Sequence, residues 1–157
     1  MKKIAYLLAS LCMLAATAAC SDYNKMPLFQ DYYVAFDPGK SSTQQVNCLG
    51  RSTGSFYVRY CGEMGEGEEI HVTFSVQPGS GLTEGVDYQI VTTGSTLTFM
   101  PGIYSIPIHI RWLSHEIDPA KDNTLTLSLE SCDKEIHIGT PGPDKKLKSL
   151  TITKFKQ

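Results

Sequence analysis

The sequence lacks the patterns that most readily indicate metal binding or phosphate chemistry. Its five cysteines contain no Cys-x-x-Cys spacing and its four histidines form no His-x-x-x-His pair, so neither a structural zinc site nor a dithiol redox motif is indicated. The glycine- and glutamate-containing segment 62–67 lacks the Lys-Ser or Lys-Thr pair of a phosphate-binding loop. We therefore expect no catalytic residue, no metal, no cofactor and no enzymatic activity.

Concentrated positive charge is missing as well. The chain carries 14 Lys and Arg against 16 Asp and Glu, for a formal net charge of −2 at pH 7. Proteins that bind nucleic acid need a basic patch or stripe to meet the phosphate backbone. The composition therefore argues against a nucleic-acid partner.

The N-terminus has the three parts of a secretory signal. Met1-Lys2-Lys3 supplies positive charge, residues 4–19 are apolar, and small residues precede Cys20. The segment Thr17-Ala18-Ala19-Cys20 resembles the lipobox of bacterial lipoproteins, in which the cysteine is diacylated and becomes the new N-terminus. Lipoproteins usually carry Leu where this chain has Thr17, and an ordinary signal peptide that ends near a chance cysteine is the alternative.

Lipidation of Cys20, with palmitate as the expected kind of acyl group, predicts a membrane-anchored protein. Two acyl chains hold a protein stably on a membrane, whereas one chain gives only marginal binding. Ser21 and Asp22 weakly resemble the export tag of Bacteroidetes surface lipoproteins, which usually carries several acids in a row. We expect a lipid-anchored protein of the outer membrane, and the sequence leaves open whether it faces the periplasm or the cell surface.

The rest of the chain predicts a short tether at 20–29 and one domain at 30–157, a length that suits a single core. No useful stretch has helical periodicity, and short runs alternate apolar with polar residues between turn-forming residues, which is typical of β-strands. The runs lie at 32–36, 44–48, 56–60, 70–77, 88–91, 96–99, 105–112, 124–129, 135–138 and 149–153. Because strand side chains point alternately to opposite faces, the predicted inward residues are Ile106, Ile108, Ile110, Trp112, Leu125, Leu127 and Leu129.

The second half of the chain carries motifs with a distinctive spacing. Gly85-Val86-Asp87-Tyr88, the strand and turn at 95–102, the alternating strand 106–110 and the strand 123–129 follow one another, and 138–141 and 150–153 close the chain. This arrangement resembles the Calx-beta domain, as found in small Bacteroidetes lipoproteins. The resemblance implies an all-β fold, namely an immunoglobulin-like antiparallel β-sandwich of about seven strands.

The chain departs from the calcium-binding members of that family. Those members place acidic residues after the strand that corresponds to 106–112 and after the last strand. Here the last strand is followed by Lys154-Phe155-Lys156, while Glu116, Asp118 and Asp122 are the acids of the other loop. Calcium takes six to eight oxygen ligands, several of them carboxylates. We therefore expect a solvated polar turn and no calcium site.

Once the predicted signal peptide at residues 1–19 is removed, the cysteines besides Cys20 are Cys48, Cys61 and Cys132. An oxidising compartment permits a disulfide, but an odd count leaves at least one thiol unpaired. Alternation places Cys48 on the inward phase of its strand and Cys61 on the outward phase, which argues against that pairing. The sequence leaves one disulfide and three separate thiols as alternatives.

Aromatic residues are the one positive indication of a binding surface. Tyr33 and Tyr57 lie off the inward phase of their strands, and Tyr104 follows a turn, so these three are the candidate binding residues. Exposed aromatics anchor protein partners or stack on sugars. We expect a non-catalytic, lipid-anchored accessory or assembly module for a protein partner. The alternative is a glycan-binding surface lipoprotein that uses these aromatics.

Overall fold

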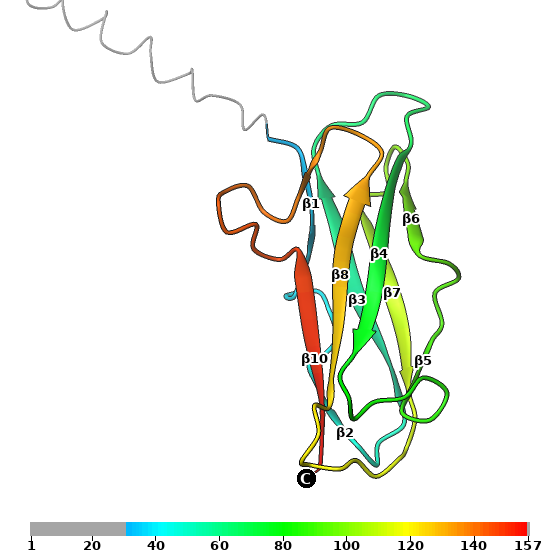
Figure 1. Cartoon of the computed structure of the whole chain (residues 1–157). Helices are drawn as coiled ribbons and strands as arrows, with labels where there is room; N and C mark the ends of the chain where they lie inside the picture. The colour runs from blue at the N-terminus through cyan, green and yellow to red at the C-terminus, as the bar shows by residue number, and fades with distance from the viewer. Residues whose placement is uncertain (1–30, 157) are drawn as a thin grey trace, which may run out of the picture. The chain divides into compact units, whose positions relative to one another are not determined.

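The computed structural model describes residues 31–156; the predicted signal peptide, Cys20 and the predicted tether at 20–29 lie outside the described residues. Between residues 31 and 156 the structure contains no helix, and so none that could span a membrane. The chain forms strands in the order shown in Figure 1. They are β1 (Tyr33–Phe36), β2 (Gln45–Asn47), β3 (Ser52–Cys61), β4 (Ile70–Pro78), β5 (Tyr88–Ile90), β6 (Thr96–Phe99), β7 (Ser105–Trp112), β8 (Thr124–Cys132), β9 (His137–Ile138) and β10 (Ser149–Phe155).

These strands form two five-stranded sheets that pack against each other. Sheet A has the order β5-β7-β3-β1-β9, and sheet B has the order β2-β10-β8-β4-β6. Apolar side chains from both inner faces form one core, in which Phe36, Phe56, Phe99 and Trp112 are the largest buried members. The prediction of an all-β sandwich is confirmed.

The expected number of about seven strands is wrong, because the described chain forms ten. The additional strands are short edge strands: β2 and β5 have three residues each and β9 has two. The arrangement is also not wholly antiparallel, since β9 runs parallel to β1 and β2 runs parallel to β10. Each of these short strands reaches its edge by a connection from the other sheet, and such crossovers, unlike hairpins, permit parallel pairing.

The predicted inward residues lie in the core. Ile108, Ile110, Trp112, Leu125, Leu127 and Leu129 are buried, and Ile106 is partly buried and packs against them. Pro107 lies opposite Tyr57 of β3, while β5 pairs with β7 only from Ile110 to Trp112. Within the described chain no strand therefore pairs with the other side of β7 at Pro107, which is an edge position that suits a residue without a backbone N–H.

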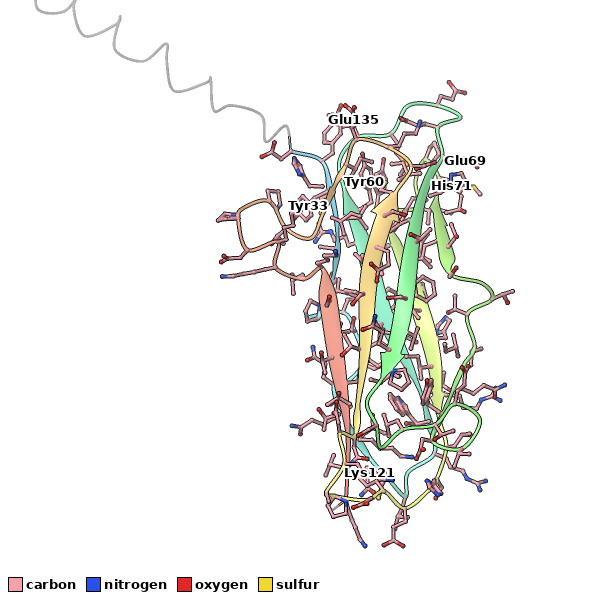
Figure 2. The ribbon with its side chains drawn as sticks, in the orientation of Figure 1. Tyr33, Tyr60, Glu69, His71, Lys121 and Glu135 are labelled. Atoms are coloured by element: carbon pink, nitrogen blue, oxygen red, sulfur yellow. The ribbon has the colours of Figure 1, made fainter. Side chains whose placement is uncertain are left out.

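The sandwich has two ends, which position the features described below. The described chain begins at the proximal end, where Tyr33 of β1 lies opposite Cys61 of β3. The distal end carries Ser52 opposite Trp112, together with the loop 113–123 and the end of β10. Figure 2 shows Tyr33 near the proximal end and Lys121 at the distal end.

Candidate functional site

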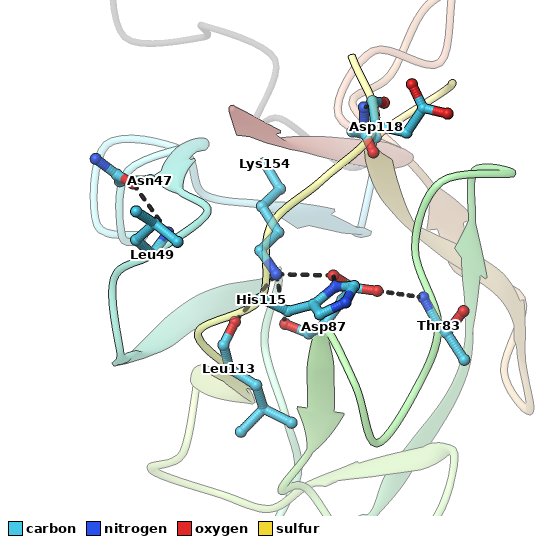
Figure 3. Close-up of polar contacts among 9 residues, drawn as sticks. Asn47, Leu49, Thr83, Asp87, Leu113, His115, Asp118 and Lys154 are labelled. Atoms are coloured by element: carbon cyan, nitrogen blue, oxygen red, sulfur yellow. Dashed lines mark hydrogen bonds and ion pairs between the residues drawn. The ribbon is translucent and has the colours of Figure 1, made fainter. Parts of the chain in front are cut away.

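The distal end contains a buried lysine, which is unusual in a domain of this size. Lys154 lies on the inward phase of β10 and is 1% exposed. Its ammonium donates hydrogen bonds to Asp87 Oδ1 at 2.9 Å and to the carbonyl of Leu113 at 3.0 Å (Figure 3). A side chain from sheet B thus holds the turn before β5 and the segment after β7.

Asp87 is held in place by its own turn. The backbone N–H of Thr83 donates to Asp87 Oδ2 at 2.9 Å, and the N–H of Asp87 donates to the carbonyl of Thr83 at 2.8 Å. This confirms the structural role expected of an Asp in a turn, where its side chain satisfies nearby backbone groups. Both carboxylate oxygens therefore have partners, one on the backbone and one on Lys154.

The ion pair decides the charge state of Asp87. Burial by itself would raise the pKa of this carboxyl group. Hydrogen bonds from Lys154, from the backbone of Thr83 and from His115 outweigh burial and hold the pKa of Asp87 below its ordinary value. Asp87 is consequently ionised at neutral pH, and its negative charge neutralises the positive charge of Lys154. A buried charge needs such a partner.

His115 completes this cluster from the solvent side. Its Nδ1 lies 2.9 Å from Asp87 Oδ1, and its side chain is half exposed. A buried Asp that orients a His also occurs in hydrolase triads. Among the described residues, however, no serine, threonine or cysteine forms a hydrogen bond with the second ring nitrogen of His115. We interpret Asp87, His115 and Lys154 as a structural cluster.

One sequence pattern at the distal end resembles that of a hydrolase nucleophile. Gly50-Arg51-Ser52-Thr53-Gly54 matches Gly-x-Ser-x-Gly. In hydrolases that pattern forms a sharp turn between a strand and a helix. Here Ser52 begins β3 and pairs with Trp112, and the described chain has no helix to follow it. The match therefore lacks the structural context that would make Ser52 a nucleophile.

The acids considered for calcium are separated by their contacts. Glu116 pairs with Lys156, Asp118 accepts a hydrogen bond from the N–H of Ala120, and Asp122 accepts one from Thr124. Lys154 and Lys156 both contact the segment 113–123, Lys154 through the carbonyl of Leu113 and Lys156 through Glu116. Within the described residues no group of three His, Cys, Asp or Glu side chains is placed to hold a metal ion.

We expect isothermal titration of the mature domain with calcium to give no heat of binding, because two ammonium groups lie where a divalent cation needs carboxylates. Each ammonium is already paired with a carboxylate, Lys154 with Asp87 and Lys156 with Glu116, so neither Asp87 nor Glu116 is free to hold the ion. The melting temperature should likewise be the same with and without a chelator. Micromolar binding, or a melting temperature that falls by many degrees in chelator, would contradict this prediction.

The three cysteines of the described chain are free thiols. Cys48 is fully buried, whereas Cys61 and Cys132 are partly exposed. Of the two alternatives left by the sequence, the structure has three separate thiols. Cys61 lies directly opposite Tyr33, and a hydrogen bond with it, together with burial, raises the pKa of the Tyr33 hydroxyl.

The three candidate tyrosines do not share one surface. Tyr33 and Tyr57 lie on the outer face of sheet A, on β1 and β3, and both are partly buried. Tyr104 is 41% exposed, but its ring stacks on that of buried Tyr60 at 6.2 Å between centroids, on the inner side of sheet A. Tyr104 therefore belongs to an aromatic cluster at the proximal end.

The outer face of sheet A also gathers basic residues that sequence reasoning did not single out. The ammonium of Lys40 lies 4.7 Å from the ring centroid of Tyr57, in cation–π contact. Arg59 is exposed on the same strand, two residues further on, and its charge acts on Tyr33. The alternation of β3 contained this signal, because Tyr57 and Arg59 share a phase.

Comparison with known proteins adds no family assignment. No protein-family model matches the chain, and no curated protein matches it at a significant level.

Proposed function

We propose that this protein is a lipid-anchored, non-catalytic module of the bacterial cell envelope that holds a protein partner on the outer face of sheet A. The observation that supports this proposal most strongly is the placement of Tyr57, Arg59 and Lys40 together on that face. Tyrosine and arginine are enriched among the residues that dominate binding energy at protein interfaces. The lipobox-like segment before the domain supports the membrane anchor.

The other outer face has a different character, which favours sheet A. Hydroxyl groups on sheet B bond to one another across its strands, Thr126 with Thr151 at 3.2 Å and Ser128 with Ser149 at 3.0 Å. Such a face has its hydrogen-bonding groups largely paired within the protein. The outer face of sheet A, by contrast, carries arginines without a carboxylate partner among residues 31–156.

Photo-crosslinking in cells tests this choice of face. A photoreactive phenylalanine analogue at Tyr57 should form a specific adduct with the partner, because that position lies within the proposed interface. The same analogue at Thr126 or Thr151, on the outer face of sheet B, should form none. The substitution Arg59→Glu should reduce the adduct at position 57. Equal adducts from both faces, or none from sheet A, would rule out the docking surface.

Glycan binding is the second candidate, because tyrosine rings on a sheet face can stack on sugars. The contact of Lys40 with the ring of Tyr57 works against it, since the ammonium occupies a ring face that a sugar would need. Affinity electrophoresis in gels that contain neutral polysaccharides separates the two functions. Retardation that is lost in Tyr57→Ala would favour the glycan.

We expect Cys20→Ala to move the protein from the membrane fraction to the soluble fraction. The physical reason is that two acyl chains are needed for stable anchoring and this substitution removes their attachment point. Cell fractionation followed by immunoblotting measures the distribution, and Cys48→Ala serves as a control that leaves the anchor intact. A Cys20→Ala protein that stays wholly in the membrane fraction would contradict the anchor.

A further inference from the structure

The distal end of sheet A carries an open cleft of about 570 Å³. Arg51, Thr53, Arg111 and Ser114 are among the residues that line it. All four side chains are exposed, and they supply two guanidinium groups and two hydroxyl groups. Guanidinium groups form paired hydrogen bonds with carboxylate and phosphate oxygens, so the cleft has the donors of an oxyanion site.

The register of the strands brings the two arginines together. Thr53 of β3 lies directly opposite Arg111 of β7, and Arg51, the residue before β3, lines the same cleft two positions before Thr53. Arg51 and Arg111 are thus diagonal neighbours, and the Cα atoms of such residues lie roughly 7–8 Å apart in an antiparallel pair. No carboxylate between residues 31 and 156 forms an ion pair with either of them.

Two like charges that lie close together without a counter-ion repel each other, which lowers the stability of the unbound protein. The cost disappears when an anion binds between them. The cleft also lies at the end of the sandwich opposite to the one where the described chain begins. It is therefore open to a partner that approaches from the side away from the chain's entry point.

We propose that this cleft binds an extended acidic segment of a protein partner, with carboxylates on alternate residues. This inference rests on the proposed function and names the chemistry of the partner. In an extended peptide the side chains of alternate residues share one face at a spacing of roughly 6.4–6.8 Å. That spacing is close to the diagonal separation of Arg51 and Arg111, and the long arginine side chains can adjust so that each guanidinium meets one carboxylate.

Two peptide isomers test the spacing. The probes are acetylated and amidated Thr-Glu-Thr-Glu-Thr, whose acids share a face, and Thr-Glu-Glu-Thr-Thr, whose acids do not. Each is titrated into the isotope-labelled mature domain, Cys20–Gln157 with Cys20→Ser, at low salt, and backbone amide shifts are followed. We expect the alternating peptide to bind more tightly and to shift the amides of 51–53 and 111–114.

Substitutions test the arginines. An exposed ion pair contributes up to about fivefold in affinity, so Arg51→Gln and Arg111→Gln should each weaken binding about threefold, and both together about tenfold. Lys121→Gln, which removes an exposed cation elsewhere at the distal end, should leave binding unchanged. Binding should also weaken in high salt, because exposed charges are screened. The proposal would be overturned if the two peptide isomers bound with equal affinity. It would also be overturned if the double variant bound the alternating peptide as tightly as the wild-type domain does.

Oligogalacturonate, which also carries regularly spaced carboxylates, is titrated in parallel. If it binds more tightly than the peptide and depends on the same arginines, the ligand is a carbohydrate and the peptide assignment is overturned. The proposed function has a separate readout. If crosslinks at Tyr57 persist while the peptide titration is flat, the docking surface stands and the acidic-segment proposal fails. If the peptide binds but sheet A yields no crosslink, the docking surface fails.

Discussion

Replacing Asp87 by Ala is expected to lower the free energy of unfolding by about 3–5 kcal/mol. The substitution leaves the ammonium of Lys154 buried with only the carbonyls of Leu113 and residue 87 as partners. An unpaired buried charge is among the costliest defects in a folded protein. Asp87→Ala also removes the acceptor for the N–H of Thr83, so the turn before β5 loses a hydrogen bond that holds it together. Urea unfolding monitored by Trp112 fluorescence measures the loss.

A double-mutant cycle separates the ion pair from the turn. Asp87→Asn keeps an acceptor for Thr83 but removes the charge, and Lys154→Met removes the cation while it preserves the length of the side chain. Each single variant should be strongly destabilised, whereas the double variant should recover a large part of the loss, because no charge is then left buried alone. Additive losses in the double variant would show that the two charges do not interact.

The pH dependence of stability provides an independent check on Asp87. Its pKa in the folded state is lowered by Lys154, Thr83 and His115 in spite of its burial, whereas an unfolded Asp titrates near about 3.9. The stabilisation is therefore present in full above the unfolded pKa and is lost as the pH falls through the folded pKa. The difference in unfolding free energy between the wild type and Asp87→Asn should accordingly be constant near neutral pH and shrink below about pH 4.

The strands of this fold were largely predictable, because alternation depends on burial of one face. Each of the ten predicted runs overlaps a strand of the structure, and the underestimate of the strand number came from the family resemblance alone. The start of β3 was missed. It reads Ser52-Thr53-Gly54-Ser55 and has no large inward side chain, since a side chain at Gly54 would collide with the ring of Phe56. Packing, rather than local preference, explains that glycine.

The buried ion pair was only half predictable. Lys154 follows Leu150 and Ile152 at a spacing of two, so the period of β10 placed a lysine on the inward phase. A lysine in the core needs a partner, but nothing local indicates which one. Asp87 lies 67 residues away along the chain, in the turn that leads into β5 of the other sheet. The partnership depends on how the two sheets pack, which the period of a single strand does not contain.

The cleft at Arg51 and Arg111 was not predictable for a related reason. Neither residue belongs to a motif, and each alone reads as an ordinary exposed cation. Their proximity follows from the pairing of Thr53 with Arg111, and therefore from the register between β3 and β7. A slip of one residue would have turned one of them to the other face. Sequence periodicity thus predicts which face a residue occupies but not its neighbour across the sheet.

Leu127→Ala is expected to lower the free energy of unfolding by about 2–5 kcal/mol. Leu127 is fully buried on β8, between Val76 of β4 and Leu150 of β10, so its removal leaves a cavity bounded on both sides by strands. Paired strands on either side restrict how far the neighbouring backbone can move into that space. For a domain of this size each kcal/mol corresponds to a shift of roughly 3–6 °C in melting temperature, which calorimetry can measure.

The neighbouring residue supplies the matched control. Thr126 points to the outer face of sheet B, where its hydroxyl bonds with that of Thr151. Thr126→Ala removes a side chain from the same strand without opening a cavity, so it should cost less than about 1 kcal/mol. If the two substitutions destabilise equally, the inward and outward phases of β8 do not differ in burial and the assignment of its faces is wrong. The two residues are neighbours on the same strand and differ mainly in the face of the sheet that they occupy. A much larger loss of unfolding free energy in Leu127→Ala than in Thr126→Ala would therefore support the assignment of the inward face from the alternation of residues 124–129.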